Sequence, residues 1–271
     1  MSMIELTKTA IAENGKANGD KPDSVERFSN RVENYAKHRP GYPPEVLDLF
    51  EAEMELTEDS VVADIGSGTG ISSCIFLENG NRVYGVEPNS KMRETAERRL
   101  ARFDKFHSVD GTAENTGLPG GSIDIVIAAQ AFHWFRPEET RGEFKRILKS
   151  GGWVALMWNE RQLNTTPFLT DYEQFLLKYA SDYTAVRHDN INDITLLEFF
   201  GKRFERASFP NAQVLDFDGL LGRAASSSYM PSEGDERFPE MEDELRGLFA
   251  KHAESGKITV FYDTNVFYTR Y

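Results

Sequence analysis

The sequence predicts an α/β fold, in which helices cover both faces of a mostly parallel seven-stranded sheet and further helices cap it. Short apolar segments alternate with stretches of helical periodicity between residues 61 and 158, and such alternation indicates a parallel sheet. Three segments, VVADI, IDIVIAA and WVALMW, are almost continuously apolar, as strands are when helices cover both of their faces. The 271-residue chain is 39% hydrophobic and 12% aromatic, which is enough to bury a large core.

The N-terminal part divides into a tail and a helix. Residues 1–22 are rich in Lys, Asn, Gly and Asp without periodicity, so we expect a mobile tail. A capping-box pattern at Asp23 begins a helix that the Arg39–Pro40 pair ends, and a second helix is expected to start at Pro43. We interpret residues 23–271 as a single domain.

The central part is expected to alternate regularly between strands and helices, the order that a parallel sheet covered on both faces requires. The expected strands are 61–65, 82–87, 106–109, 123–129 and 152–158, and the expected helices are 69–79, 89–101 and 137–149.

After residue 159 the alternation weakens. Residues 160–203 are expected to be mainly helical and to form an insertion between the fifth and sixth strands, which caps the sheet together with the N-terminal helix. The remaining expected elements are a strand at 205–217, helices at 218–228 and 234–253, and an antiparallel strand pair or one long strand over KITVFYDTNVFYTRY.

The charge and composition of the chain limit which partners, location and metal content we expect. With 31 Lys and Arg against 44 Asp and Glu, the formal net charge of −13 disfavours nucleic acids and anionic membranes. No apolar run approaches the roughly 18 residues of a membrane span. The beginning of the sequence does not read as a secretory signal, Cys74 is the single cysteine, and the five histidines lack metal-ligand spacing. We therefore expect a cytoplasmic protein without a metal, either a monomer or a homodimer.

The most informative segment joins the first expected strand to a glycine loop and a helix. The order Asp64-Ile-Gly66-Ser-Gly68-Thr-Gly70 lets the backbone turn sharply and approach a ligand closely. About 20 residues later the next strand ends at Glu87, where a carboxylate can accept hydrogen bonds from both hydroxyls of a ribose. Together the two features predict a nucleoside-binding site.

The spacing of the glycines argues against two common nucleotide sites. A dinucleotide loop needs its third glycine at position 71, but that residue is Ile71 and the glycine is Gly70. A Walker A loop needs Gly-Lys-Ser/Thr, and no Lys or Arg occurs between Glu53 and Asn81. Neither NAD nor a nucleoside triphosphate is therefore expected.

Beyond this loop, a series of segments resembles the class I S-adenosylmethionine-dependent methyltransferases, and among them the small-molecule group called type 11. The segments are Asp64-x-Gly66-x-Gly68-x-Gly70, Glu87-Pro-Asn-Ser-Lys-Met92, Gly111-Thr-Ala-Glu114, Ser122-Ile-Asp124, Ala129-Gln-Ala-Phe-His-Trp-Phe135 and Leu148-Lys-x-Gly-Gly152. They cover residues 30 to 160, in order and with the usual spacing. The resemblance implies a Rossmann-like fold and S-adenosylmethionine as cofactor.

The resemblance also implies roles for individual residues. The glycine loop would pass under the methionine part with Asp64 near its ammonium group, Glu87 would hold the ribose, and Gln130 would face the sulfonium. Many relatives carry Asp where this chain has Thr112, so here the backbone or Glu114 is expected to contact the adenine. The implied cofactor-binding residues are Asp64, Gly66, Ser67, Gly68, Gly70, Glu87, Pro88, Met92, Thr112, Ala113, Glu114, Gln130 and Ala131.

The acceptor is expected to lie under a lid formed by residues 23–44. The part from Tyr35 to Pro43 resembles the lid of that group, and its prolines and glycine predict a segment that orders over the cofactor. Candidate catalytic residues are His133 and Tyr35, although His133 can instead belong to a packed aromatic corner and Tyr35 to the core. Candidate acceptor contacts are Arg39, Tyr42, Trp134, Asn159 and Arg161.

The implied function is transfer of the sulfonium methyl group to a small-molecule acceptor by in-line displacement. Such a reaction requires alignment of the acceptor, exclusion of water and, for some acceptors, removal of a proton. A general base is thus optional, and the sequence indicates the cofactor better than the acceptor. The alternative is a sensing or interaction protein that binds S-adenosylmethionine or another nucleoside without transferring a methyl group.

Overall fold

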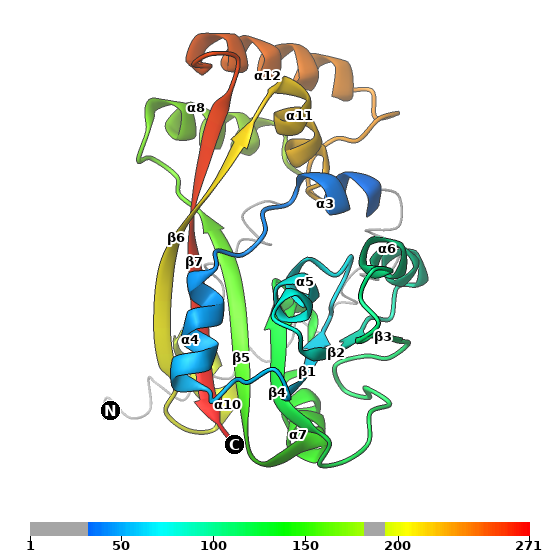
Figure 1. Cartoon of the computed structure of the whole chain (residues 1–271). Helices are drawn as coiled ribbons and strands as arrows, with labels where there is room; N and C mark the ends of the chain where they lie inside the picture. Colours follow the sequence, from blue (N-terminus) through cyan, green and yellow to red (C-terminus); the bar gives the residue numbers. More distant parts are fainter. Residues whose placement is uncertain (1–31, 182–192) are drawn as a thin grey trace, which may run out of the picture.

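The computed structural model describes residues 32–181 and 193–271, which form a sheet with helices on both faces and a helical cap at one end (Figure 1). The predicted tail at 1–22, the first part of the predicted lid at 23–31 and a part of the predicted insertion at 182–192 lie outside the described residues. Within the described ranges, no helix has the length and apolar character needed to cross a membrane.

Seven strands form one sheet in the order β3-β2-β1-β4-β5-β7-β6. The strands are β1 (Val61–Ile65), β2 (Arg82–Val86), β3 (Phe106–Val109), β4 (Ile123–Ala129), β5 (Leu148–Arg161), β6 (Glu205–Leu215) and β7 (Ile258–Arg270). The first five pair in parallel, and β7 pairs antiparallel with both β5 and β6. This confirms the predicted Rossmann-like α/β fold. The strand order reverses between β1 and β4, and open α/β sheets bind ligands at such a point.

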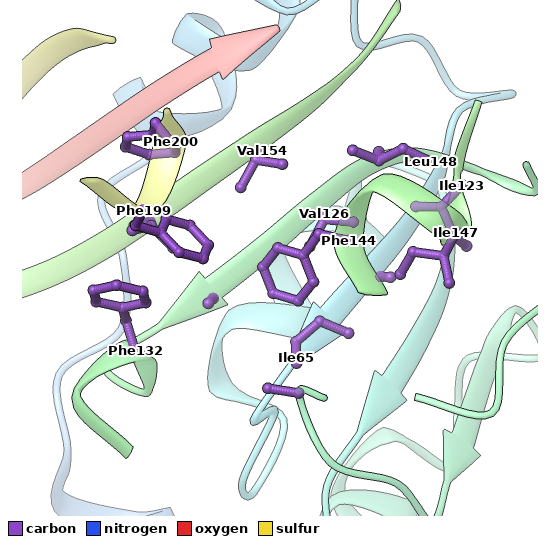
Figure 2. Packing of buried hydrophobic residues seen from close by; sticks show 14 of the residues in the cluster. Ile65, Ile123, Val126, Phe132, Phe144, Ile147, Leu148, Val154, Phe199 and Phe200 are labelled. Atoms are coloured by element: carbon purple, nitrogen blue, oxygen red, sulfur yellow. The ribbon is translucent and has the colours of Figure 1, made fainter. Parts of the chain in front are cut away.

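Alternate residues of the central strands pack against helices on opposite faces. The sheet-covering helices are α4 (Glu45–Glu53), α5 (Ile71–Glu78), α6 (Ser90–Leu100), α7 (Pro137–Ile147) and α10 (Asp193–Phe200). On one face Phe50 of α4 packs in a cluster with Ile125. On the other face, Phe144 of α7 and Phe199 of α10 pack in a cluster with Val126 (Figure 2). Because Ile125 and Val126 are neighbours on β4, this strand is buried on both faces, as its apolar sequence predicts.

The cap has a hydrophobic cluster of its own. Its helices are α8 (Pro167–Tyr179), α11 (Phe217–Ala225) and α12 (Phe238–His252), which pack around the first half of β7 through residues such as Leu176, Leu220, Leu245 and Tyr262. The helix α3 (Val32–His38) lies below α11, between the cap and the sheet (Figure 1).

Two features differ from the prediction. β5 extends to residues 148–161 because β7 pairs with it continuously from Trp153 to Arg161. Within its described residues, the predicted insertion supplies α8 to the cap and α10 to the sheet; α11 and α12 add to the cap. The reason is that β6 and β7 remain paired as far as Leu215 and Ile258, so the helices between them begin beyond the parallel sheet.

Candidate functional site

Two adjoining cavities lie where β1, β2 and β4 end, below the cap. The larger has a volume of about 540 Å³ and the smaller about 200 Å³. Both walls include Tyr35, Gly66, Gly68, Gln130 and Trp134, so the cavities form one continuous site. Of the residues that the sequence suggested for binding or catalysis, all line one of the two cavities except Asp64 and Gly70.

Gly66 and Gly70 allow the loop after β1 to pass close to its neighbours. Their φ angles are +71° and +76°, which residues with a side chain rarely adopt. A Cβ atom on Gly66 would lie 2.6 Å from the Cβ of Ala131, and one on Gly70 would lie 2.5 Å from Cδ1 of Leu100. The loop can therefore follow this path only with glycine at both positions.

The carboxylate of Asp64 is fully buried behind this loop. The hydroxyls of Ser72 and Ser73 donate hydrogen bonds to its Oδ2 atom at 2.6 and 2.7 Å, while Oδ1 has no partner in the described part of the chain. Burial raises the pKa of Asp64 to about 6, and the two hydroxyl donors oppose this rise. Because Ser72 lines the larger cavity, Asp64 is an incompletely satisfied anion directly behind the cavity wall.

Glu87 lies just beyond β2 and lines the smaller cavity. Its Oε2 accepts a hydrogen bond from the backbone N–H of Gly68 at 3.0 Å, and its Oε1 accepts one from Asn89 at 2.9 Å. Burial raises the pKa of Glu87, and these two backbone donors oppose the rise. The carboxylate thus has a fixed position next to the glycine loop, and each oxygen retains room to accept from a ligand.

The far end of the smaller cavity is mainly apolar. Pro88, Met92 and Ala113 line it, and Met92 and Ala113 are each 5% exposed. Thr112 and Glu114 supply polar atoms there, but Glu114 Oε1 already accepts a hydrogen bond from the backbone N–H of Arg136 at 2.8 Å. An apolar slot of this kind suits a flat heteroaromatic ring.

The segment after β4 lines both cavities. Gln130 has a φ angle of +57°, and its Nε2 donates to the backbone carbonyl of Asn159 at 3.2 Å. A residue other than glycine in this conformation is strained, and such strain concentrates at functional sites. In the following 3₁₀ helix (Phe132–Trp134), Phe132 packs into the core while His133 and Trp134 line the larger cavity.

Residues of α3 and of the segment after it form one wall of the larger cavity. Tyr35, Arg39 and Tyr42 all line it, and the Arg39 guanidinium lies 4.8 Å from the centre of the Tyr35 ring. Burial holds the pKa of the Tyr42 phenol well above its usual value. The backbone carbonyl of Gly41 accepts a hydrogen bond from Asn159 Nδ2 at 3.0 Å, which ties this segment to β5.

Arg161 lines the cavity but has a carboxylate partner of its own. Its guanidinium pairs with Glu173 of α8 and lies 5.3 Å from the centre of the Tyr172 ring. Asn159 is also engaged, because its Oδ1 accepts hydrogen bonds from Thr264 at 2.5 Å and Asn211 at 3.1 Å. Both side chains therefore shape the wall through contacts with their neighbours.

Sequence reasoning did not identify Arg223, which α11 brings to the same cavity. It lies 184 residues after Arg39, outside every recognisable motif, and only the packing of α11 on α3 places it at the site. Ser228 and Tyr229, which follow α11 and line the cavity, were missed for the same reason.

Asp124 lies outside the cavities and has a structural role. It accepts hydrogen bonds from the backbone N–H of Val61 at 2.8 Å and from Lys149 Nζ at 2.7 Å, which tie β4 to β1 and β5. Among the described residues, no group of three or more His, Cys, Asp or Glu side chains is arranged to hold a metal ion.

Comparisons with known proteins agree with this geometry. A family model described as a methyltransferase domain matches residues 63–156, which include the glycine loop, Glu87 and β4. An uncharacterized methyltransferase of Mycobacterium tuberculosis is 36% identical over 227 residues, covering 83% of this chain and 86% of its own length. An uncharacterized methyltransferase-like protein of Schizosaccharomyces pombe is 27% identical over 250 residues, covering 90% and 94%. Both relatives therefore extend well beyond the part that the family model matches.

The fold has counterparts among solved structures. A structure described as a type II methyltransferase from Anaeromyxobacter dehalogenans superimposes with a TM-score of 0.63. It is 20% identical in sequence and covers 86% of this chain and 97% of its own. This likeness concerns the arrangement of the sheet and helices.

Proposed function

The chain belongs to the class I S-adenosylmethionine-dependent methyltransferases, and we propose that it transfers the methyl group to a small-molecule acceptor bound in the larger cavity. The observation that carries this proposal is that the glycine loop after β1 and the Glu87 carboxylate after β2 open into one continuous site. A site of about 540 Å³ next to one of about 200 Å³ is of the size that holds a cofactor and a small second substrate.

The residues present fit S-adenosylmethionine. We assign the adenosine part to the smaller cavity, where Glu87 can accept from the ribose hydroxyls and the apolar slot around Met92 can hold the adenine. Asp64, whose Oδ1 has no hydrogen-bond partner among the residues that the structure describes, is the counter-charge that we assign to the ammonium group of the methionine part. The remaining contacts are assigned to Gly66, Ser67, Gly68, Pro88, Thr112, Ala113, Glu114, Gln130 and Ala131, with Gly70 shaping the loop.

When bound, this cofactor supplies a methyl group activated by attachment to a sulfonium. The protein then has to align an acceptor with it and keep water out. We assign these tasks to Tyr35 and Trp134, which line both cavities, with Arg39 and Tyr42 closing the wall above them. Asn159 and Arg161 support that wall. For an acceptor that must lose a proton, we assign the base to His133, whose ring lines the acceptor cavity.

The position of α3 and the segment after it supports their proposed role as a lid. Residues 32–44 lie next to the cap (Figure 1) and contribute Tyr35, Arg39, Pro40 and Tyr42 to the cavity wall. We propose that this segment orders when the cofactor binds. The single cysteine of the chain is compatible with the cytoplasmic location that the sequence analysis expects.

Binding measurements test the assignment of the cofactor. We expect isothermal titration calorimetry to show binding of S-adenosylmethionine and of S-adenosylhomocysteine, and no binding of NAD under the same conditions. Tight binding of NAD, or no binding of either adenosyl compound, would contradict the proposal. The similarity to methyltransferases over 83% of the chain favours the enzyme over the sensing protein that the sequence left as an alternative.

A further inference from the structure

Two arginines that line the larger cavity have no carboxylate partner among the described residues. Arg39 and Arg223 form no ion pair with any described residue, in contrast to Arg161, which pairs with Glu173. The Nε atom of Arg39 is buried and finds no hydrogen-bond partner in the described ranges. Charged groups held away from water are ordinarily paired with an opposite charge, and the described part of this wall supplies none for these two arginines.

The two guanidiniums converge on one neutral hydroxyl group. Arg39 Nη2 lies 3.5 Å from the Oγ atom of Ser227, and Arg223 Nη1 lies 3.2 Å from the same atom. Their other acceptors are also uncharged: Arg39 donates to the backbone carbonyl of Ser226 at 3.2 Å, and Arg223 donates to the hydroxyl of Tyr262 at 3.2 Å. Two positive charges are thus held side by side with only neutral acceptors.

The fold holds the pair together despite mutual repulsion. α11 packs so closely on α3 that a Cβ atom on Gly222 would lie 2.3 Å from Cδ2 of the His38 ring. Because Arg39 follows His38 and Arg223 follows Gly222, this close contact fixes both arginines at the same edge of the cavity. Burial lowers the pKa of Arg39, and the positive charge of Arg223 acts in the same direction. Guanidinium groups nevertheless stay protonated at neutral pH.

The acidic side chains in the cavity do not supply the missing charge. Glu160 and Asp263 line it as neighbours on β5 and β7, and Asp263 Oδ1 accepts a hydrogen bond from Gln162 at 2.9 Å. Neither forms an ion pair with Arg39 or Arg223. The cavity is therefore divided into an acidic edge on the sheet and a basic edge at α3 and α11.

We infer that the acceptor carries an anionic group, a carboxylate or a phosphate, which Arg39 and Arg223 hold at this basic edge. The inference rests on the proposed function, because it concerns the second substrate of the same site. Guanidinium forks match the planar oxygens of such anions and bind them with charge-assisted hydrogen bonds. When the anionic group of the acceptor binds to the arginine pair, the rest of the acceptor lies in the cavity that Tyr35, His133 and Trp134 line.

Calorimetry with simple probes tests the inference on the full chain. Succinate, inorganic phosphate and the neutral analogue succinamide are titrated with and without saturating S-adenosylhomocysteine. We expect at least one of the two anions to bind about tenfold or more tightly than succinamide, as charge-assisted hydrogen bonds would give. Succinate and phosphate in separate titrations distinguish a carboxylate site from a phosphate site. Equal binding of succinate and succinamide, together with no binding of phosphate, would overturn the inference.

Variants identify the site. Arg39→Gln and Arg223→Gln should each weaken anion binding about tenfold or more, and Arg39→Lys should weaken it less because it keeps the charge. Arg102→Gln is the matched control, since Arg102 is exposed and pairs with Glu78 far from the cavity. Unchanged anion binding in both Gln variants would overturn the inference. Thermal melting checks that each variant folds. If a Gln variant does not fold, anion binding to Arg39→Lys and the comparison of anions with succinamide on the wild-type protein still test the inference.

The two proposals fail in different ways. S-adenosylhomocysteine that does not bind to the wild-type protein would count against the proposed function and leave the anion titrations interpretable. Normal binding of S-adenosylhomocysteine without arginine-dependent anion binding would count against the acceptor class alone.

Discussion

The sheet half and the cap half of this protein build their binding surfaces in different ways. The cofactor side of the site comes from adjacent strand ends, and its key groups, Gly66, Gly68 and Glu87, lie within one continuous stretch of chain. The proposed acceptor side is assembled from Arg39, which follows α3, and Arg223 of α11, and these two helices meet only in the folded structure. In our proposal, local backbone geometry thus forms the cofactor site, whereas the packing of helices distant in sequence forms the acceptor site.

A glycine substitution should produce the largest effect on the sheet half. Gly66→Ala places a Cβ atom 2.6 Å from Ala131 in a backbone conformation that favours glycine, so we expect S-adenosylmethionine to bind about a hundredfold more weakly. Gly142→Ala on α7 is the control, because that position has open space around it and should leave the affinity unchanged. Calorimetry on both variants makes the comparison; normal affinity in Gly66→Ala would mean that the loop can follow another path.

Removing the carboxylate of Glu87 should have a smaller effect. Glu87→Ala deletes a charged acceptor for the ribose and leaves the N–H groups of Gly68 and Asn89 without their partner. We expect S-adenosylmethionine to bind at least about tenfold more weakly. Glu78→Ala, at an exposed residue on α5, serves as the control. If the two variants bind the cofactor equally well, the ribose assignment is wrong.

Substitution of Asp64 should affect stability and cofactor binding in opposite directions. The pKa of Asp64 is about 6 in the folded protein, above its ordinary value of 3.8. The folded state therefore binds this proton more tightly than the unfolded state does, and it gains stability from it at low pH. This gain is fully present below pH 3.8 and is lost as the pH rises through 6. Asp64→Asn keeps an acceptor for Ser72 and Ser73 but carries no charge. At pH 7.5 without cofactor, we expect its free energy of unfolding to exceed that of wild type by about 2 to 3 kcal/mol, and this difference to vanish near pH 4.

Urea unfolding at several pH values measures this difference, and calorimetry on the same samples should show weaker binding of S-adenosylmethionine to Asp64→Asn. If Asp64→Asn is less stable than wild type at pH 7.5, the charged Asp64 carboxylate is already stabilised by its surroundings in the cofactor-free protein.

The lid should give the smallest and most local effect. We expect amide hydrogen exchange of residues 32–44 to slow by about tenfold when S-adenosylhomocysteine binds, because ordering over the cofactor reduces local opening. The helix α12, which lines neither cavity, is the internal control and should exchange at the same rate in both states. Equal exchange of 32–44 with and without ligand would mean that this segment is ordered before the cofactor arrives.

The sheet half could be predicted from the sequence better than the cap half. The strand over Val61–Ile65 and the glycine loop after it could be predicted, because apolar runs and glycine spacing are local signals. The extension of β5 to Arg161 depends on its pairing with β7, a partner about a hundred residues away, and local patterns do not contain that information. Arg223 was missed for the same reason: nothing near it in sequence shows that Gly222 allows α11 to approach His38.

The central claim, methyl transfer to a small molecule, is tested most directly by following the methyl group. The protein is incubated with S-adenosylmethionine carrying a deuterated methyl group and with a cell metabolite extract, and the products are analysed by mass spectrometry. We predict that S-adenosylhomocysteine accumulates only when the extract is present and that the label appears in a small compound, which by our further inference carries an acidic group. No S-adenosylhomocysteine despite demonstrated cofactor binding, or label that appears in no small compound, would contradict the account.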